Sequence, residues 1–261
     1  MNISINAPSY KRPDRVKTLN YIPFCKIWVD EGEAEAYRNG NPGAQIVACP
    51  KGVQGNLCRV RNYILDTEFA NGADVVLIID DDLSYLERFD CVEGFGYSRR
   101  RIETDEILPI LEKYSILAMD LGAKFWGMNC NSDNMTFRHY TPFSTAAYIG
   151  GPFQCFLKGN RCRYDENLPL KEDYDMTLQQ LNLERVVLRV NGYHYICEQS
   201  TIAGGCASIR NREKEQQQFE ALQAKWGGQI VRRDCSNKGK TTKEKAWDDY
   251  NPIIKIPIKG V

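Results

Sequence analysis

Three consecutive carboxylates, Asp80, Asp81 and Asp82, follow a run of five apolar residues at positions 75–79. A short apolar run rich in β-branched residues is typical of a buried strand. Side chains alternate along a strand, so Asp80 and Asp82 project to one side and Asp81 to the other. Paired carboxylates are costly unless a cation joins them, and Mg²⁺ or Mn²⁺ prefers such oxygen ligands. The pattern predicts a metal site; the alternative is an acidic turn in which Asp82 or Ser84 caps a following helix.

The elements that must position these carboxylates alternate through the first half of the chain. Strands are predicted at residues 3–7, 25–29, 45–49 and 75–79, and helical segments between them at 14–19, 33–38 and 57–69. A strand-helix-strand alternation predicts a mostly parallel sheet with helices on both faces. Ligands bind beyond the carboxyl ends of the strands in such sheets, which is where the three carboxylates fall.

The second half is less regular. We expect a long helix at 104–122, then antiparallel strands and loops lining a pocket over 124–157. A strand-to-helix transition at 170–181, a strand at 185–190, a polar helix at 210–226 and a β-rich segment at 253–256 follow. Gly227 and Gly228 supply the C-cap of the polar helix.

Composition narrows the class of protein. The 261 residues carry 34 basic and 34 acidic side chains, a neutral balance that argues against coating nucleic acid by charge alone. Local basic patches remain candidates at 98–101, 161–163, 210–214, 232–233 and 238–245. The ten cysteines show no CxxC pair, and we expect reduced thiols. With no signal-peptide pattern and no run of about 20 apolar residues, a cytoplasmic protein without a membrane span is expected.

Four short motifs follow one another along the chain in a characteristic order. They are the turn at 8–13, the acidic end of the second strand at 29–32, the Gly-rich helix entry at 52–62, and the Asp-x-Asp at 80–82. This succession resembles the donor half of GT-A fold glycosyltransferases. The resemblance implies an α/β, Rossmann-like GT-A fold, with a mostly parallel central sheet, helices on both faces and a smaller antiparallel acceptor-side portion. It also implies a nucleotide-sugar site made by Pro8, Ser9, Tyr10, Arg12, Asp30, Arg61, Asn62, Asp80 and Asp81. Mn²⁺ or Mg²⁺ would bind Asp80 and Asp82.

A fifth piece, residues 164–176, looks like the acceptor-side segment of that family, in which an acidic pair opens a helix. The pair is Glu172 and Asp173, and in an inverting reaction either carboxylate suits the removal of the acceptor's proton. Stabilisation of a helix dipole is the alternative. The family often supplies a late histidine as a third metal ligand, and His194 is in the expected place; a hydrogen-bonded core residue is the other interpretation. The resemblance spans roughly residues 3–195.

A closer resemblance is to the phage-type glycosyltransferases associated with TET/JBP oxygenases. It rests on the Pro-Ser-Tyr-x-Arg-Pro start, the Asp-Asp-Asp run and the compact domain. It implies a DNA acceptor carrying 5-hydroxymethylcytosine or another hydroxymethylpyrimidine, and the host cytoplasm if a phage encodes the chain. Aromatic side chains available to stack on a flipped base, or else to fill the core, are Trp126, Phe137, Tyr140 and Phe143.

The sequence thus predicts a metal-dependent, inverting hexosyltransferase that uses UDP-glucose or a similar donor. Residues 1–210 would form the GT-A domain, with a donor half to about residue 90 and an acceptor half after it, and 211–261 a helix and basic tail packed on the same domain. Other hypotheses remain: a small-molecule or glycan acceptor, a non-catalytic module that binds nucleotide sugars, or a nucleotidyltransferase. The last is disfavoured because Pro8-Ser9-Tyr10 replaces the Gly-rich phosphate loop such enzymes usually carry after the first strand.

Overall fold

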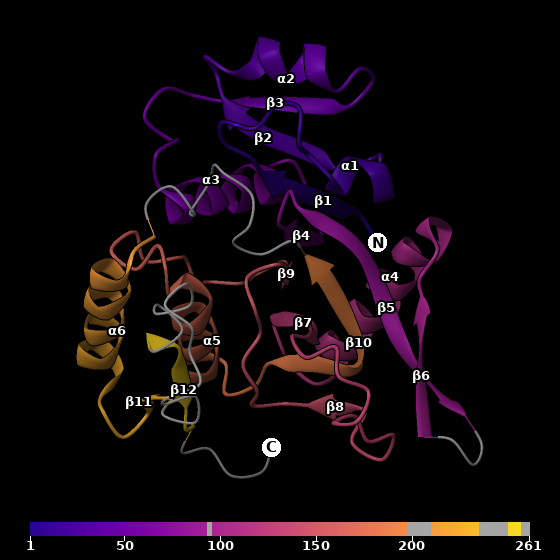
Figure 1. Cartoon of the computed structure of the whole chain (residues 1–261), viewed down its shortest axis with the longest axis vertical. Helices are drawn as coiled ribbons and strands as arrows, with labels where there is room; N and C mark the ends of the chain where they lie inside the picture. Colours follow the sequence, from indigo (N-terminus) through magenta and orange to yellow (C-terminus); the bar gives the residue numbers. More distant parts are fainter. Residues whose placement is uncertain (93–95, 198–209, 235–249, 257–261) are drawn as a thin grey trace.

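One large sheet dominates the computed structural model, which describes residues 1–92, 96–197, 210–234 and 250–256 (Figure 1). Its strands run in the order β3-β2-β1-β4-β9-β7-β10-β5-β6, with β8 also paired to β10. The bounds are β1 Ile3–Pro8, β2 Lys26–Asp30, β3 Gln45–Cys49, β4 Val75–Ile79, β5 Leu83–Val92, β6 Gly96–Arg101, β7 Phe125–Asn129, β8 Phe143–Ser144, β9 Phe153–Leu157 and β10 Leu188–Cys197. A separate two-stranded sheet pairs β11 (Val231–Arg233) with β12 (Pro252–Ile254).

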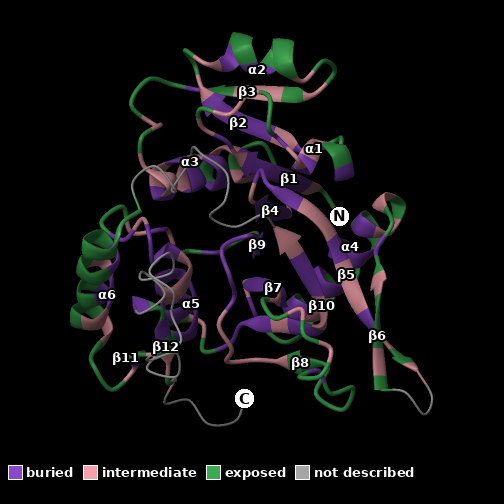
Figure 2. Ribbon diagram, in the orientation of Figure 1, coloured by how far each residue is buried: buried purple, intermediate pink, exposed green. Residues whose placement is uncertain are grey.

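Helices cover both faces of the large sheet. They are α1 Thr18–Tyr21, α2 Ala34–Gly40, α3 Leu57–Ala70, α4 Thr104–Asp120, α5 Glu172–Leu183 and α6 Arg212–Trp226. One apolar core includes side chains of α2 and α4, and a second includes side chains of α3 and α5. Strand β4 serves both, because Val75, Leu77 and Ile79 face the first core while Val76 and Ile78 face the second. Figure 2 shows this strand as buried along its length.

The predicted α/β fold class is confirmed. Strands β3, β2, β1 and β4 are parallel, and their carboxyl ends share one edge. Beyond β4 the pairing becomes mixed: β9 is antiparallel to both β4 and β7, β10 is parallel to β7, and β5 and β6 are antiparallel. The antiparallel part consists of strands that follow β4 in the chain, and it is more extensive than the sequence suggests.

The segment after the three carboxylates differs from one expectation. Asp82 is followed directly by strand β5, so neither Asp82 nor Ser84 caps a helix there, and the capping interpretation is wrong. Strand β5 leaves the carboxylates along β10, with Leu83 opposite Cys197. The chain therefore turns at Asp80–Asp82 from the parallel half of the sheet into the antiparallel half.

The C-terminal helix α6 packs against α5. Lys171, at the start of α5, and Glu215 of α6 form a buried ion pair 2.5 Å long, and Trp226 donates to the buried Asp175 at 2.7 Å. Gly227, the expected C-cap residue, ends α6 with φ 89°, a conformation that favours glycine. Within the described ranges no helix is long and apolar enough to cross a membrane. Among the described residues no disulfide joins two cysteines, and Cys206 and Cys235 lie outside them.

Candidate donor and acceptor site

The three carboxylates sit at the carboxyl edge of the parallel strands, in a turn fixed by Thr18. The Thr18 hydroxyl donates to the carbonyl of Asp80 at 2.7 Å and accepts from the amide of Leu83 at 3.1 Å, and its own amide donates to the carbonyl of Asp81. These bonds satisfy backbone groups on either side of the turn. The turn is therefore held in one conformation while its side chains point in different directions.

Asp81 points back toward the turn after β1. Its Oδ2 accepts a short hydrogen bond from the Ser9 hydroxyl and forms an ion pair with Arg12 Nε at 3.0 Å. The Ser9 hydroxyl also lies 2.8 Å from that of Tyr37. Burial nevertheless raises the pKa of Asp81 to about 6. The middle carboxylate thus has protein partners, and Ser9 and Arg12 serve it rather than facing outward.

Asp82 is compensated less well, because the charge of Arg12 and a hydrogen bond with the Cys197 thiol do not offset its burial. It is 8% exposed, and its buried Oδ1 has no hydrogen-bond partner among the described residues. Burial, and then the charges of Asp80 and Asp81, raise its pKa to about 7. A buried carboxylate oxygen beside two further carboxylates is stabilised by a cation, so this donor set fits a divalent metal. No group of three or more His, Cys, Asp or Glu in the described part of the chain is arranged to hold one. Two carboxylates fit Mg²⁺ or Mn²⁺ bound mainly by water and substrate phosphates.

The raised pKa of Asp82 gives metal binding a pH dependence. The folded protein keeps a proton on Asp82 below about pH 7, whereas the unfolded chain has already lost it, so folding stability falls as pH rises through this window. A cation replaces that proton, and we expect Mn²⁺ to raise the melting temperature more at about pH 8 than at about pH 5.5. Thermal unfolding with and without Mn²⁺ measures this, and Asp82→Asn should abolish the difference. An equal rise at both pH values would contradict the assignment.

Arg61 connects the carboxylate turn to the start of α5. Asn56 caps α3 by accepting from the amides of Cys58 and Arg59, which starts the helix at this edge of the sheet. Arg61, one turn later, is 1% exposed; its Nη2 lies 2.9 Å from Asp80 Oδ1 and its Nη1 lies 3.2 Å from Glu172 Oε1. A single guanidinium therefore joins both acidic groups that the sequence singles out.

The acidic pair Glu172 and Asp173 opens α5, as the sequence predicts. Burial, and then the charge of Asp173, raise the pKa of Glu172 to about 8. Gly151, in the segment before β9, has no side chain in the space between Glu172 and Asp173. A Cβ there would lie 3.4 Å from Arg61 Nη1, 3.4 Å from Asp173 Oδ2 and 3.5 Å from Glu172 Oε1. The guanidinium of Arg61 and the two carboxyl groups thus converge on a backbone position that carries no side chain.

The sequence model of the TET-associated glycosyltransferase family matches residues 4–205, which include every residue of this site. The chain belongs to this family. It is a glycosyltransferase by that membership, and the resemblance seen in its motifs is confirmed. No curated protein sequence matches it.

Solved structures with a similar arrangement share little sequence with this TET-associated glycosyltransferase. Glucosyl-3-phosphoglycerate synthase from Mycobacterium tuberculosis, in complex with Mn²⁺, UDP-glucose and phosphoglyceric acid, is 10% identical, with 91% of this chain and 85% of that chain covered and a TM-score of 0.49. S. aureus TarS 1–349, in complex with UDP, is 14% identical over 94% of this chain and 77% of that chain, with a TM-score of 0.44.

Two predicted site residues have other tasks in the structure. Asn62 uses both side-chain atoms on the backbone of Tyr164, donating at 2.9 Å and accepting at 2.8 Å, so it anchors the segment before α5. His194 is fully buried, its Nε2 lies 2.8 Å from Glu87, and burial lowers its pKa. Strand β10 reaches the carboxylate turn at Cys197, which pairs with Leu83, and His194 lies three residues, roughly 10 Å, before Cys197. His194 is therefore not brought together with Asp80 and Asp82. Its role as a metal ligand has no support here.

The remaining predicted donor residues lie along the same edge. Pro8 ends β1 and Tyr10 follows it, while Asp30 ends β2 and accepts from the amide of Gly32 at 2.9 Å. Because β1 and β2 are parallel, these ends are adjacent, next to the carboxylate turn after β4. The sequence pair Gly204-Gly205, which could line a donor pocket or only allow a tight turn, lies outside the described residues.

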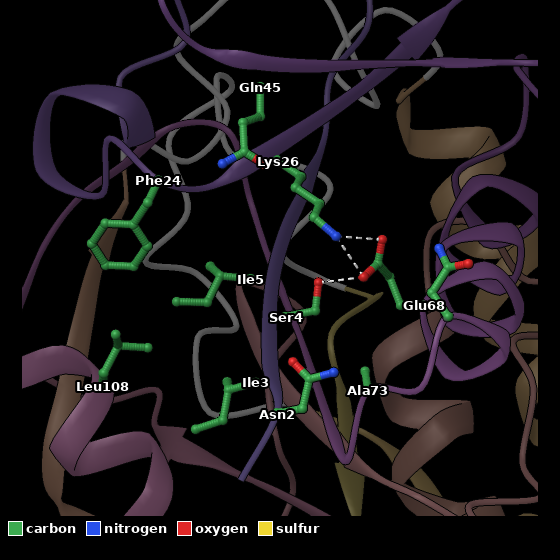
Figure 3. Close-up of a pocket in the computed structure, with 11 residues that line it drawn as sticks. Asn2, Ile3, Ser4, Ile5, Phe24, Lys26, Gln45, Glu68, Ala73 and Leu108 are labelled. Carbon is green, nitrogen blue, oxygen red and sulfur yellow. Dashed lines mark hydrogen bonds and ion pairs between the residues drawn. The ribbon is translucent and has the colours of Figure 1, made fainter.

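A cavity of about 340 Å³ lies at the opposite edge, at the amino ends of β1, β2 and β3 (Figure 3). There Lys26 and Ser4 both point to Glu68, with Nζ and Oγ 2.7 and 2.6 Å from Glu68 Oε2. The apolar residues Ile3, Ile5, Phe24 and Leu108 lie on the other side of β1. The buried carboxylate of Glu68 is already paired with Lys26 and Ser4, and the cavity lies at the edge of the sheet away from the site.

Three residues to which the sequence assigned no role complete the site: Thr18, Tyr148 and Gly151. Thr18 bonds to the carboxylate turn although more than sixty residues separate them in the sequence. The Tyr148 hydroxyl donates to Asp173, which lies 25 residues further along the chain. Only the Gly-Gly pair at 150–151 was visible in the sequence, as part of a segment expected to line a pocket. Their roles arise from strand order, which places β9 between β4 and β7.

Proposed function

We propose that this chain transfers a sugar from a nucleoside-diphosphate sugar, UDP-glucose or a similar donor, to the hydroxyl of a 5-hydroxymethylpyrimidine in DNA, with inversion at the anomeric carbon. The observation that carries the proposal is the partnerless Oδ1 of Asp82, next in the turn to Asp80, which the guanidinium of Arg61 joins to Glu172, the neighbour of Asp173 in the chain. A cation site and a candidate base then flank the same space.

On the donor side, Asp80 and Asp82 would hold Mn²⁺ or Mg²⁺ together with the diphosphate. The bound metal would offset the charge that develops on the departing diphosphate. Asp30 and Tyr10, at the adjacent strand ends, are proposed to contact the nucleoside, since ligands of such sheets bind beyond these ends. Asp81 belongs to this site indirectly, by fixing the turn after β1 through Ser9 and Arg12.

On the acceptor side, Asp173 is proposed as the general base. Burial and the charge of Asp173 raise the pKa of Glu172 to about 8, which favours its protonated form and makes Asp173 the better candidate to accept a proton. In the reaction the acceptor oxygen bonds to the anomeric carbon, the bond from that carbon to the diphosphate oxygen breaks on the opposite face, and the acceptor's proton passes to Asp173. The nucleoside diphosphate then leaves.

The support for a DNA acceptor is the family itself and two exposed aromatic side chains. Tyr140 and Phe143 are 70% and 39% exposed, whereas Trp126 and Phe137 belong to the core. The basic side chains of the β5–β6 hairpin have local partners: Arg100 pairs with Glu106, and Arg101 lies over aromatic rings. Arg232 and Arg233 are exposed on β11, and 238–245 lies outside the described residues. Stacking on a displaced base is better supported than a broad electrostatic contact.

Mass spectrometry of DNA containing 5-hydroxymethylcytosine or 5-hydroxymethyluracil, incubated with the protein, Mn²⁺ and a panel of nucleotide sugars, tests the proposal. A gain of one hexose that a chelator abolishes is the expected result. Donor hydrolysis without any gain on DNA would redirect the acceptor to a small molecule or glycan. An untouched donor would leave a nucleotide-sugar-binding module, and pyrophosphate released from a nucleoside triphosphate and a sugar phosphate would identify a nucleotidyltransferase.

A further inference from the structure

The carboxylate of Asp173 is held by hydrogen-bond donors on both oxygens. Its Oδ2 accepts from the Tyr148 hydroxyl and from the amide of Gly151 at 3.1 Å, and its Oδ1 accepts from the amide of Tyr174 at 2.8 Å. The amide of Tyr174 belongs to the helix that carries Asp173 itself. The other two donors come from the segment between β8 and β9, so this segment sets the direction in which the carboxylate points.

Tyr148 is itself fixed on both sides. Its ring stacks on that of Tyr174 with centroids 4.2 Å apart and an interplanar angle of 15°. The next residue, Ile149, donates its amide to the Thr177 hydroxyl at 3.3 Å, and that hydroxyl donates to the carbonyl of Asp173 at 2.9 Å. Burial raises the pKa of Tyr148 well above its ordinary value, so the phenol stays protonated and remains a donor.

The hydrogen bond from Tyr148 determines which way Asp173 Oδ2 points relative to Gly151. The oxygen that Tyr148 contacts is the one 3.4 Å from the Cβ position of Gly151, where Arg61 and Glu172 also converge. Rotation of the Asp173 side chain would move this oxygen away from that space. Small misplacements of a reacting group are expensive, at about 100-fold in rate for roughly 1 Å.

We propose that Tyr148 is a positioning residue that acts only through Asp173, holding its Oδ2 toward the space beside Gly151 where the acceptor hydroxyl would lie. The inference rests on the proposed function, in which Asp173 is the base. Tyr148 touches neither donor nor metal ligands in this scheme, so its loss should slow turnover and leave donor binding unchanged.

The test compares Tyr148→Phe, Asp173→Asn and the double variant in the full chain with Mn²⁺. The assays are transfer to 5-hydroxymethylcytosine DNA and donor hydrolysis by water, which needs no acceptor. We expect Tyr148→Phe to lower kcat by about 10- to 100-fold with KM for the donor unchanged. The double variant should be no slower than Asp173→Asn alone, since residues that act as a unit are not additive. Tyr250→Phe is the matched control: it removes the hydroxyl that donates to Gln216 at 2.9 Å on α6, and kcat should not change.

The inference would be overturned if Tyr148→Phe kept the wild-type kcat. It would also be overturned if Tyr148→Phe slowed the Asp173→Asn variant by the same factor as it slows the wild type. If Asp173→Asn keeps wild-type kcat, the proposed base fails instead, and the two failures are thereby distinguished. A crystal structure of Tyr148→Phe gives a readout that needs no activity. We expect the Asp173 carboxylate to leave its present orientation there, and an unmoved carboxylate would also overturn the inference.

Discussion

Replacing Asp82 by asparagine should abolish the Mn²⁺-dependent part of UDP binding. The substitution keeps the shape of the side chain but removes the charge from the buried oxygen that has no hydrogen-bond partner among the described residues. Changes to groups that only support a metal ligand cost about 10- to 100-fold in affinity, so loss of a ligand should cost at least about 100-fold. Calorimetric titration of UDP, with and without Mn²⁺, measures the effect.

Asp81→Asn is the matched control one position away. It weakens the contacts with Ser9 and Arg12, and we expect a loss of about 1–3 kcal/mol in unfolding free energy because buried donors lose a charged acceptor. UDP should still bind in the presence of Mn²⁺. If Asp82→Asn binds as tightly as the wild type, or if Asp81→Asn alone loses Mn²⁺-dependent binding, the metal ligands are not the pair assigned here.

The position of the three carboxylates directly after a buried strand, at the carboxyl edge of the sheet, was predictable from the sequence, because a short apolar run needs only local pattern to be recognised as a strand. The four parallel strands were predictable for the same reason, since each apolar run is bounded by turns. The pairing of Arg61 with Asp80 and Glu172 could not be predicted from the sequence. It joins positions 19 and 111 residues apart, and depends on how α3 and α5 pack on one face.

Strand β5 shows how a local pattern can mislead. Its buried residues Leu83, Leu86 and Phe89 recur every three positions, a spacing that by itself suggests a helix face rather than a strand. The antiparallel ladder with β10 on one side and β6 on the other forms a strand instead. Partners far along the chain outweigh the local periodicity.

His194 and Asn62 show the limit of transferring roles by motif. Both stand where the family resemblance expects functional residues, yet the sheet register places His194 opposite Glu87, and Asn62 faces the backbone of Tyr164. Whether a polar side chain is free to meet a substrate depends on its hydrogen-bond partners, and these come from other parts of the chain. The position of a residue in a motif does not reveal them.

Asp173→Asn should lower kcat by about 100- to 10,000-fold, the usual contribution of a positioned general base, while donor affinity stays unchanged. Single-turnover transfer with excess enzyme separates the chemical step from binding. Glu172→Gln is the decisive comparison, because a carboxyl that already holds a proton near neutral pH resembles its amide. We expect that variant to keep kcat within a few-fold of the wild type. If Glu172→Gln loses transfer and Asp173→Asn retains it, the base is Glu172, and Arg61, 3.2 Å from its Oε1, must hold it ionised.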